Sequence, residues 1–174
     1  MRSSCGYGPR ARPLDCAVSD ALTSRSFGRH QRVGIDSNVL IYLLEGSSPL
    51  ADTAGALLDA LAAEEATGVL SALAVAEVAT GPARLGDAAM VQRYADELTS
   101  LENVQVVAMD TGVAVEAALV RAGPLTLADV IHLATARLGG ATAFVTNDRW
   151  VRSIDRLEVL YLDELDAADI DPRQ

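Results

Sequence analysis

The sequence predicts an α/β fold, in which a short and mostly parallel sheet carries helices on both of its faces. Two observations predict it. Apolar runs of two to six residues, the length of short buried strands, alternate with segments of about ten or more residues that have helical periodicity. Glycine, proline and helix-capping residues stand between these segments. The chain has 174 residues, half of them hydrophobic, which suits one domain with a substantial core.

Five short strands are expected, each an uncharged run of mainly aliphatic residues. In chain order they cover residues 33–35, 69–70, 104–109, 143–146 and 159–162. Short apolar runs without polar alternation are typical of strands that are buried on both faces.

Six helices are expected between the strands, each bounded by a capping residue, glycine or proline. From start signal to stop signal they run Asn38 to Gly46, Pro49 to Gly68, Ser71 to Gly81–Pro82, Asp87 to Leu101, Thr111 to Gly123–Pro124, and Thr126 to Gly139–Gly140. A further helical turn is expected over residues 150–156, after the fourth strand.

Charge divides the chain into three parts. Residues 1–32 hold six arginines and two aspartates, a balance of +4, and their lack of an apolar period predicts a basic, poorly ordered extension. One hypothesis is that translation begins near Val33 and that this extension is not part of the natural product. The other residues hold eight arginines and 22 acids, a balance of −14. We expect a folded domain at 33–165 and an acidic tail at 166–174.

The residue types present exclude several chemistries. All 14 basic residues are arginine, so the chain has no P-loop lysine, no Schiff-base lysine and no catalytic lysine of the haloacid-dehalogenase phosphatases. Two histidines cannot build a zinc site that needs several. The two cysteines lie near the N-terminus and are interpreted as incidental thiols. No apolar run approaches the roughly 18–20 residues of a membrane span, so a cytoplasmic protein is expected.

Four acidic residues stand alone in uncharged surroundings. Asp36, Glu77 and Asp129 are each the only formal charge in a stretch of at least twelve residues. Asp148 follows ten uncharged residues. Asp36 and Asp148 follow strands, and ligands of parallel sheets bind beyond the carboxyl ends of strands. If the four acids converge there, a hard divalent cation would compensate their charges, because the chain has no lysine to do so. Such a cation can activate a water molecule to attack a phosphodiester.

Each acid also has an interpretation as a local structural residue. Asp36 and Asn38 could form a turn and a helix cap, Asp129 could complete a capping box, and Asp148 could be a turn residue or cap. Glu77 lies inside an apolar helix and has no local partner. The joint occurrence of the four acids favours a shared site.

The segments that carry these acids resemble the PIN-domain family, and within it the VapC-type ribonuclease toxins of bacterial toxin–antitoxin pairs. The family's opening strand and D-[ST]-N motif are matched by IDSNVLIYLLEG, and its S-x-x-x-x-x-E helix by SALAVAEV. Its D-A-x-H-L-A-T-A helix is matched by LTLADVIHLATARLGG, and its T-N-D segment by FVTNDRW. The resemblance covers residues 33 to about 165.

This resemblance implies an acidic quartet that holds Mg²⁺ or Mn²⁺, namely Asp36, Glu77, Asp129 and Asp148. Asn38 and Thr146 would support the quartet through polar contacts. The resemblance also implies a three-layer α/β/α sandwich, a homodimer, and an antitoxin whose basic or aromatic tail occupies the active-site groove. A basic tail would complement the acidic charge of the domain.

Other polar residues near these motifs have weaker indications. His132, one turn after Asp129, is interpreted as a packing or hydrogen-bonding residue rather than as a base. Arg149, Arg152 and Arg156 follow at helical spacing and could contact RNA phosphates, or could simply form a solvated helix face.

The first functional hypothesis is a metal-dependent endoribonuclease, the toxin of a type II pair, which hydrolyses a structured RNA with a metal-activated water. The alternative is a catalytically silent PIN domain that acts as an RNA- or protein-binding module. A dehalogenase-type phosphatase is a third hypothesis, which the absence of lysine and the presence of Asn38 in place of a second aspartate oppose.

Overall fold

A computed structural model describes residues 30–46, 48–120, 124–154 and 156–167. Most of the predicted basic extension and most of the acidic tail therefore lie outside the described residues. The predicted boundary at residues 32 and 33 falls inside the first strand, because that strand begins at Arg32. None of the helices in the described ranges has the length and apolar character needed to span a bilayer.

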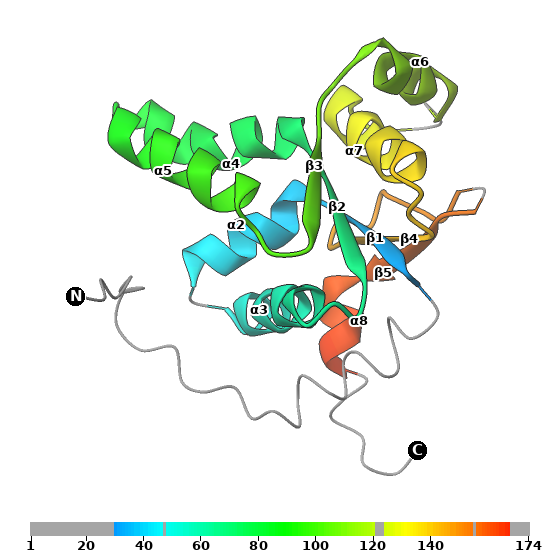
Figure 1. The fold of residues 1–174 in the computed structure, drawn as a ribbon, viewed down its shortest axis with the longest axis horizontal. Helices are drawn as coiled ribbons and strands as arrows, with labels where there is room; N and C mark the ends of the chain where they lie inside the picture. Colours follow the sequence, from blue (N-terminus) through cyan, green and yellow to red (C-terminus); the bar gives the residue numbers. More distant parts are fainter. Residues whose placement is uncertain (1–29, 47, 121–123, 155, 168–174) are drawn as a thin grey trace.

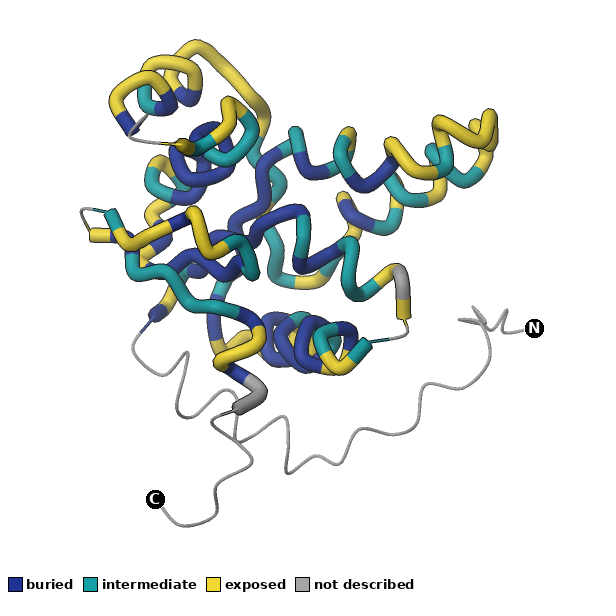
Figure 2. Tube along the Cα trace, turned by 180° about the vertical axis from the view of Figure 1, so that it is seen from behind, coloured by how far each residue is buried: buried dark blue, intermediate teal, exposed yellow. Residues whose placement is uncertain are grey.

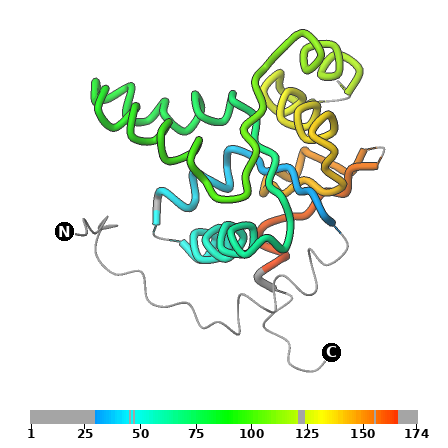
Figure 3. Tube along the Cα trace, viewed as in Figure 1, coloured from blue at the N-terminus to red at the C-terminus, as the bar shows by residue number. Residues whose placement is uncertain are grey.

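The described strands form one sheet in which all neighbours are parallel (Figure 1). They are β1 (Arg32–Ile35), β2 (Thr67–Ser71), β3 (Val104–Val107), β4 (Ala143–Thr146) and β5 (Glu158–Tyr161), in the order β3-β2-β1-β4-β5. Figure 3 shows β1, from early in the described chain, running beside β4, from late in it. The order changes direction between β1 and β4, which is the switch point where open parallel sheets bind ligands.

Helices cover both faces of the sheet, so the predicted three-layer α/β/α sandwich is confirmed (Figures 1 and 2). The helices are α2 (Ser37–Glu45), α3 (Pro49–Ala62), α4 (Ala72–Arg84), α5 (Ala88–Thr99), α6 (Thr111–Val120), α7 (Leu127–Leu138) and α8 (Leu162–Ala167). One core contains α2, α3 and α8 with Ile35 and Leu70 of the sheet. The other contains α6 and α7 with Val69 and Phe144. Helices α4 and α5 pack side by side and extend beyond the sheet.

Glycine at position 34 lets α7 lie directly on the middle of the sheet. A Cβ atom added to Gly34 would be 2.5 Å from Ala136 Cβ and 2.7 Å from the Phe144 ring, which is closer than carbon atoms can pack. This contact sets the position of α7, the helix that carries Asp129 and His132, relative to β1.

Substituting Gly34→Ala should therefore destabilise the protein by about 1–3 kcal/mol, as overpacked cores do. Chemical denaturation of the variant would measure the change in the free energy of unfolding. Gly81→Ala is the matched control, because nothing lies within 4 Å of its added Cβ and alanine favours the helix. Equal effects of the two substitutions would contradict the packing argument.

Several predicted element ends are wrong at the starts and stops of helices. Helix α2 begins at Ser37 with Asp36 in the N-cap position, instead of being capped by Asn38, because the Asn38 amide bonds to Asp36 and Thr146. Helix α4 continues through Gly81 and Pro82 to Arg84, since a proline in the last turn removes only one internal hydrogen bond. By contrast, the predicted caps at Ser71, Asp87 and Thr126 are confirmed.

Two further helix boundaries differ from the prediction for local reasons. Helix α3 ends at Ala62 rather than near Gly68, because Glu64 takes a positive φ of 62° and turns the chain into β2. Helix α6 is capped by Asp110 instead of Thr111, because the Val113 N–H donates to Asp110 Oδ1 at 2.9 Å.

The segment after β4 is also different from the prediction. The described residues of the predicted helical turn, 150–154 and 156, are not helical. Instead, the Val151 N–H donates to the Asp148 carbonyl in a turn, and an antiparallel bridge joins Ile154 to Leu157. The last strand is followed by α8, which was not predicted. Leu162 and Leu165 are buried on one side of α8, which packs against α3.

Candidate functional site

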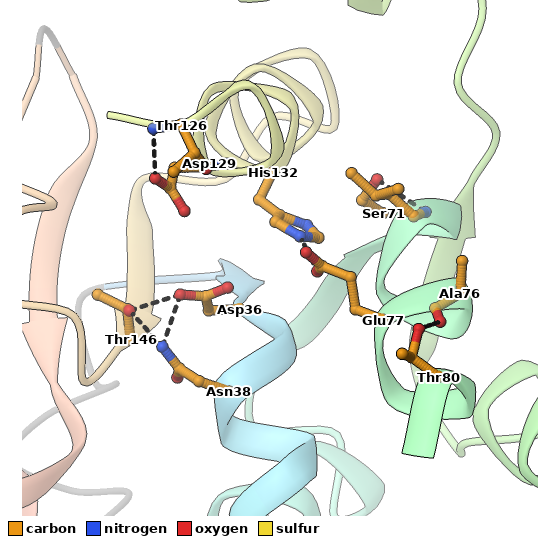
Figure 4. Close-up of polar contacts among 11 residues, drawn as sticks. Asp36, Asn38, Ser71, Ala76, Glu77, Thr80, Thr126, Asp129, His132 and Thr146 are labelled. Carbon is orange, nitrogen blue, oxygen red and sulfur yellow. Dashed lines mark hydrogen bonds and ion pairs between the residues drawn. The ribbon is translucent and has the colours of Figure 1, made fainter. Parts of the chain in front are cut away.

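The candidate site lies at the carboxyl ends of β1 and β4, around Asp36. The Asp36 N–H donates to the Val145 carbonyl at 3.0 Å, which ties the end of β1 to β4. The Asp36 carboxylate is buried, with 7% of the residue exposed. Its Oδ2 accepts a hydrogen bond of 2.5 Å from the Thr146 hydroxyl and one of 2.8 Å from the Asn38 amide (Figure 4). The two residues predicted to support Asp36 are therefore in contact with it.

The Thr146 hydroxyl is the centre of this network. It donates its one proton to Asp36, and it accepts from the Asn38 amide and from the Asp148 backbone N–H, both at 3.0 Å. Asn38 Oδ1 in turn accepts from the Asn147 N–H at 3.3 Å. Because a hydroxyl has one donor and two acceptor sites, these bonds fix its orientation. The network holds the backbone of Asp148 beside Asp36.

The environment of Asp36 disfavours its ionised form. Burial raises the pKa of the carboxyl, and the negative charge of Asp129 raises it further. The hydrogen bond from Thr146, the nearby His132 and the Ser37 backbone lower the pKa, but the net change is upward. The protein groups around this carboxylate thus compensate its charge only in part.

Asp129 has a local role and also faces the site. It completes a capping box on α7: its Oδ2 accepts from the Thr126 N–H at 2.7 Å, and its own N–H donates to the Thr126 hydroxyl at 3.2 Å. Figure 4 shows the Asp129 carboxylate pointing from α7 toward Asp36 and Thr146. The local interpretation is confirmed, and it is compatible with a role in the site.

Asp148 also has the local role that its Asn-Asp context predicts. Its Oδ1 accepts from the Trp150 N–H at 2.9 Å and its carbonyl from the Val151 N–H at 3.1 Å, so it stabilises a turn. The side chain is half-buried at the end of β4. The contact of Asp148 with the site is therefore made by its backbone N–H, which donates to the Thr146 hydroxyl.

Glu77 comes to the site from α4 and is paired with His132 of α7. Glu77 Oε2 lies 2.7 Å from His132 Nε2; the imidazole is 2% exposed and the glutamate side chain 32%. The hydrogen bond from His132 lowers the pKa of the Glu77 carboxyl, and a hydrogen bond from the Ser37 side chain adds to this against the effect of burial. The interpretation of His132 as a hydrogen-bonding residue is confirmed.

The four acids are gathered at one end of the sheet, but they do not close on a single point. No three acidic, histidine or cysteine side chains of the described ranges lie close enough together to hold one metal ion. Asp36, Asp129 and the Asp148 backbone lie near the switch point, while Glu77 and His132 form a pair beside them (Figure 4).

The three arginines predicted as possible phosphate contacts do not share one environment: Arg149 is paired with acidic residues, whereas Arg152 and Arg156 are exposed. Arg149 NH2 lies 2.7 Å from both oxygens of Asp163, NH1 contacts Glu164, and the guanidinium lies 4.1 Å from the centre of the Tyr161 ring. Its charge is already matched by carboxylates of α8. Arg152 and Arg156 are exposed on the irregular segment between β4 and β5.

Comparisons with known proteins agree with this architecture. The family model described as the PIN domain matches residues 33–157. VapBC2 from Rickettsia felis, solved bound to a DNA fragment from its promoter, aligns with a TM-score of 0.56 and 16% identity over 75% of this chain and 98% of that chain. A toxin–antitoxin complex from Klebsiella pneumoniae aligns with a TM-score of 0.53 and 24% identity over 72% of this chain and 94% of that chain. No curated protein sequence matches the chain.

Proposed function

Because the chain belongs to the PIN-domain family, we propose that it is a metal-dependent endoribonuclease and the toxin of a type II toxin–antitoxin pair. The observation that carries this proposal is the Asp36 carboxylate. It is buried at the switch point of the sheet, its pKa is raised, and Asp129 faces it. A second negative charge near a buried carboxylate is unfavourable unless a cation binds between them.

The donor set fits Mg²⁺ or Mn²⁺. Its members are carboxylate oxygens, which hard divalent cations prefer, and the chain has no lysine that could supply the positive charge instead. Asp36 and Asp129, which face each other, would hold the ion first. Asp148 and Glu77 would complete the acidic quartet by moving their side chains toward it, because no three of these groups in the described ranges already lie close enough to bind one ion. When bound, the cation would activate water and stabilise the charge that develops on the phosphate.

The other residues of the site would keep the acids in place. Thr146 and Asn38 hold the Asp36 carboxylate by Oδ2, and the Thr126 capping box holds Asp129 by Oδ2. Both acids are thus oriented before a ligand arrives, which lowers the reorganisation needed for binding.

The proposed substrate is RNA, encountered in the cytoplasm. The domain is strongly acidic, so few side chains can contact phosphates directly, and a bound cation would do most of that work. Arg152 and Arg156 are the proposed phosphate contacts, since they are exposed on the segment that follows Asp148.

An apolar groove next to a hollow that reaches Glu77 supports the proposed antitoxin partner. About 370 Å³ in volume, it lies between α2, α3 and α5 and has a mainly leucine lining that includes Leu40, Leu43 and Leu58. A second hollow of about 230 Å³ shares Leu44 and Tyr94 with the groove and reaches Glu77. An antitoxin segment with apolar side chains followed by a basic residue would fit both the groove and the acids.

The outer face of α6 supports the proposed homodimer. Val115 and Leu119 are 57% and 76% exposed there. Glu116, the one charged residue of α6, pairs with Arg137 of α7 at 3.2 Å. An exposed apolar face is unusual on so acidic a chain, and two copies could meet there without strong repulsion between their charges.

Purified protein incubated with total RNA tests the nuclease proposal. We expect cleavage with Mg²⁺ or Mn²⁺, and a loss of at least about 100-fold in EDTA, because the acids alone cannot stabilise the charge of the reacting phosphate. Restoring the cation in excess should restore cleavage, which controls for irreversible damage. Cleavage that persists in EDTA would contradict the metal requirement. No cleavage of any RNA would favour the catalytically silent binding module.

A further inference from the structure

We propose, on the basis of the proposed function, that His132 is a positioning residue that holds the Glu77 carboxylate at the acidic site. The imidazole is buried on α7, and its Nε2 lies 2.7 Å from Glu77 Oε2 on α4. An ionised carboxylate has no proton to donate and can only accept hydrogen bonds, so the Nε2–H group of His132 is the donor.

Glu77 needs such a partner because of where it is placed. It lies in the second turn of α4, a helix that extends with α5 beyond the sheet (Figure 1). The residues around it on α4 are mostly apolar, and about one third of its side chain is exposed. A long side chain in this position has many rotamers, so its carboxylate reaches a fixed place only if another group holds it.

His132 is well suited to fix that place. Its own side chain is buried among the apolar residues of α7, and α7 lies directly on β1 through the Gly34 contact with Ala136. The imidazole is therefore rigid relative to Asp36, which follows β1. Figure 4 shows the His132–Glu77 pair on one side of Asp36, with Asp129 approaching from the same helix as His132.

The surroundings of the second ring nitrogen, Nδ1, favour a positioning role for His132 over a role as a proton relay. His132 Nδ1 is buried and has no hydrogen-bond partner among the described residues. A relay would need a second group to exchange protons with, whereas a positioning residue needs only the bond to Glu77. Among the described residues, the ring therefore makes its hydrogen bond to Glu77 alone.

The experiment measures Mn²⁺ affinity of the RNA-free protein by calorimetry, alongside kcat and KM for RNA cleavage. His132→Phe fills the space but removes the donor, and should weaken Mn²⁺ binding by about 10–100-fold, with a fall in kcat and little change in KM. His132→Gln places an N–H group near the position of Nε2 and should restore most of the affinity. Thr135→Val is the matched control, because Thr135 is buried one turn along the same helix and should not affect Mn²⁺.

A double-mutant cycle with Glu77→Gln decides whether His132 acts through Glu77. In the Glu77→Gln background, His132→Phe should have no further effect on Mn²⁺ affinity. Additive losses, or an unchanged affinity in His132→Phe, would overturn the proposal. If that variant does not fold, the same cycle is run with His132→Ala, which also removes the donor and should weaken Mn²⁺ binding only where Glu77 is present. Because the affinity cycle needs no RNA, its result separates failure of this proposal from failure of the nuclease proposal.

Discussion

Replacing Asp36 with asparagine is expected to abolish RNA cleavage and at the same time to make the metal-free protein more stable at neutral pH. Asparagine keeps an oxygen that can accept from Thr146 and Asn38, so the network around residue 36 should survive. It lacks the charge that holds a divalent cation, and we expect activity to fall by at least about 100-fold. Opposite effects on activity and stability are typical of residues retained for function.

The sign of the stability effect follows from the pKa of Asp36. Burial raises this pKa above the ordinary value of 3.8, so the folded protein binds the proton more tightly than the unfolded chain. The stability that Asp36 contributes is then fully present below pH 3.8 and is lost as the pH rises through the folded-state pKa. At pH 7 the ionised carboxylate is a destabilising charge in the metal-free protein, and asparagine removes it.

Thermal unfolding in EDTA measures this effect. At pH 7 the variant should gain about 0.5–2 kcal/mol, with Tm rising by roughly 2–4 °C for each kcal/mol. The gain should shrink as the pH approaches 4, where the wild-type carboxyl is protonated more fully. A variant that is less stable than wild type at pH 7 would contradict the burial argument, and a variant with wild-type cleavage would contradict the metal site.

The features predicted well from the sequence are those set by neighbouring residues. The capping box of Thr126 and Asp129 and the cap at Ser71 need only a few residues of context, and both are present. The cap at Asn38 was wrong because the Asn38 amide bonds to Thr146, which is 108 residues away in the chain. The helical turn after Asp148 was wrong because the segment is drawn into a bridge between Ile154 and Leu157.

The same distinction applies to the candidate site. Asp36 and Asp148 could be placed together because parallel strands bring their carboxyl ends to one edge. The partner of Glu77 could not be found, because His132 is 55 residues away and meets it only through the packing of α4 against α7. An unpartnered carboxylate in an apolar helix predicts that some partner exists, but the fold decides which one.

Thr146→Val should disable the site without removing any acid. Thr146 is fully buried, and its hydroxyl is bonded to Asp36, to Asn38 and to the N–H of Asp148. Valine has nearly the same shape, but it removes the acceptor of the Asn38 amide and the Asp148 N–H, and it leaves Asp36 with only one of its two side-chain donors, Asn38. We expect a loss of about 1–3 kcal/mol in the free energy of unfolding, the usual effect of unpaired buried polar groups. Activity and Mn²⁺ affinity should fall by about 10–100-fold, as they do when a residue that orients metal ligands is removed.

Thr146→Ser separates the hydroxyl from the packing of the side chain. Serine keeps the donor and both acceptor sites and loses only a buried methyl group, which is worth about 1 kcal/mol. Its Mn²⁺ affinity and cleavage rate should therefore stay near those of wild type, although its stability falls. If serine and valine reduce Mn²⁺ affinity equally, the loss would come from the methyl group rather than from the hydroxyl.

Since the hydrogen bond from Thr146 lowers the pKa of Asp36, the valine variant should also hold the Asp36 proton more tightly than wild type does. Its Mn²⁺ binding should then need a higher pH, whereas that of the serine variant should not.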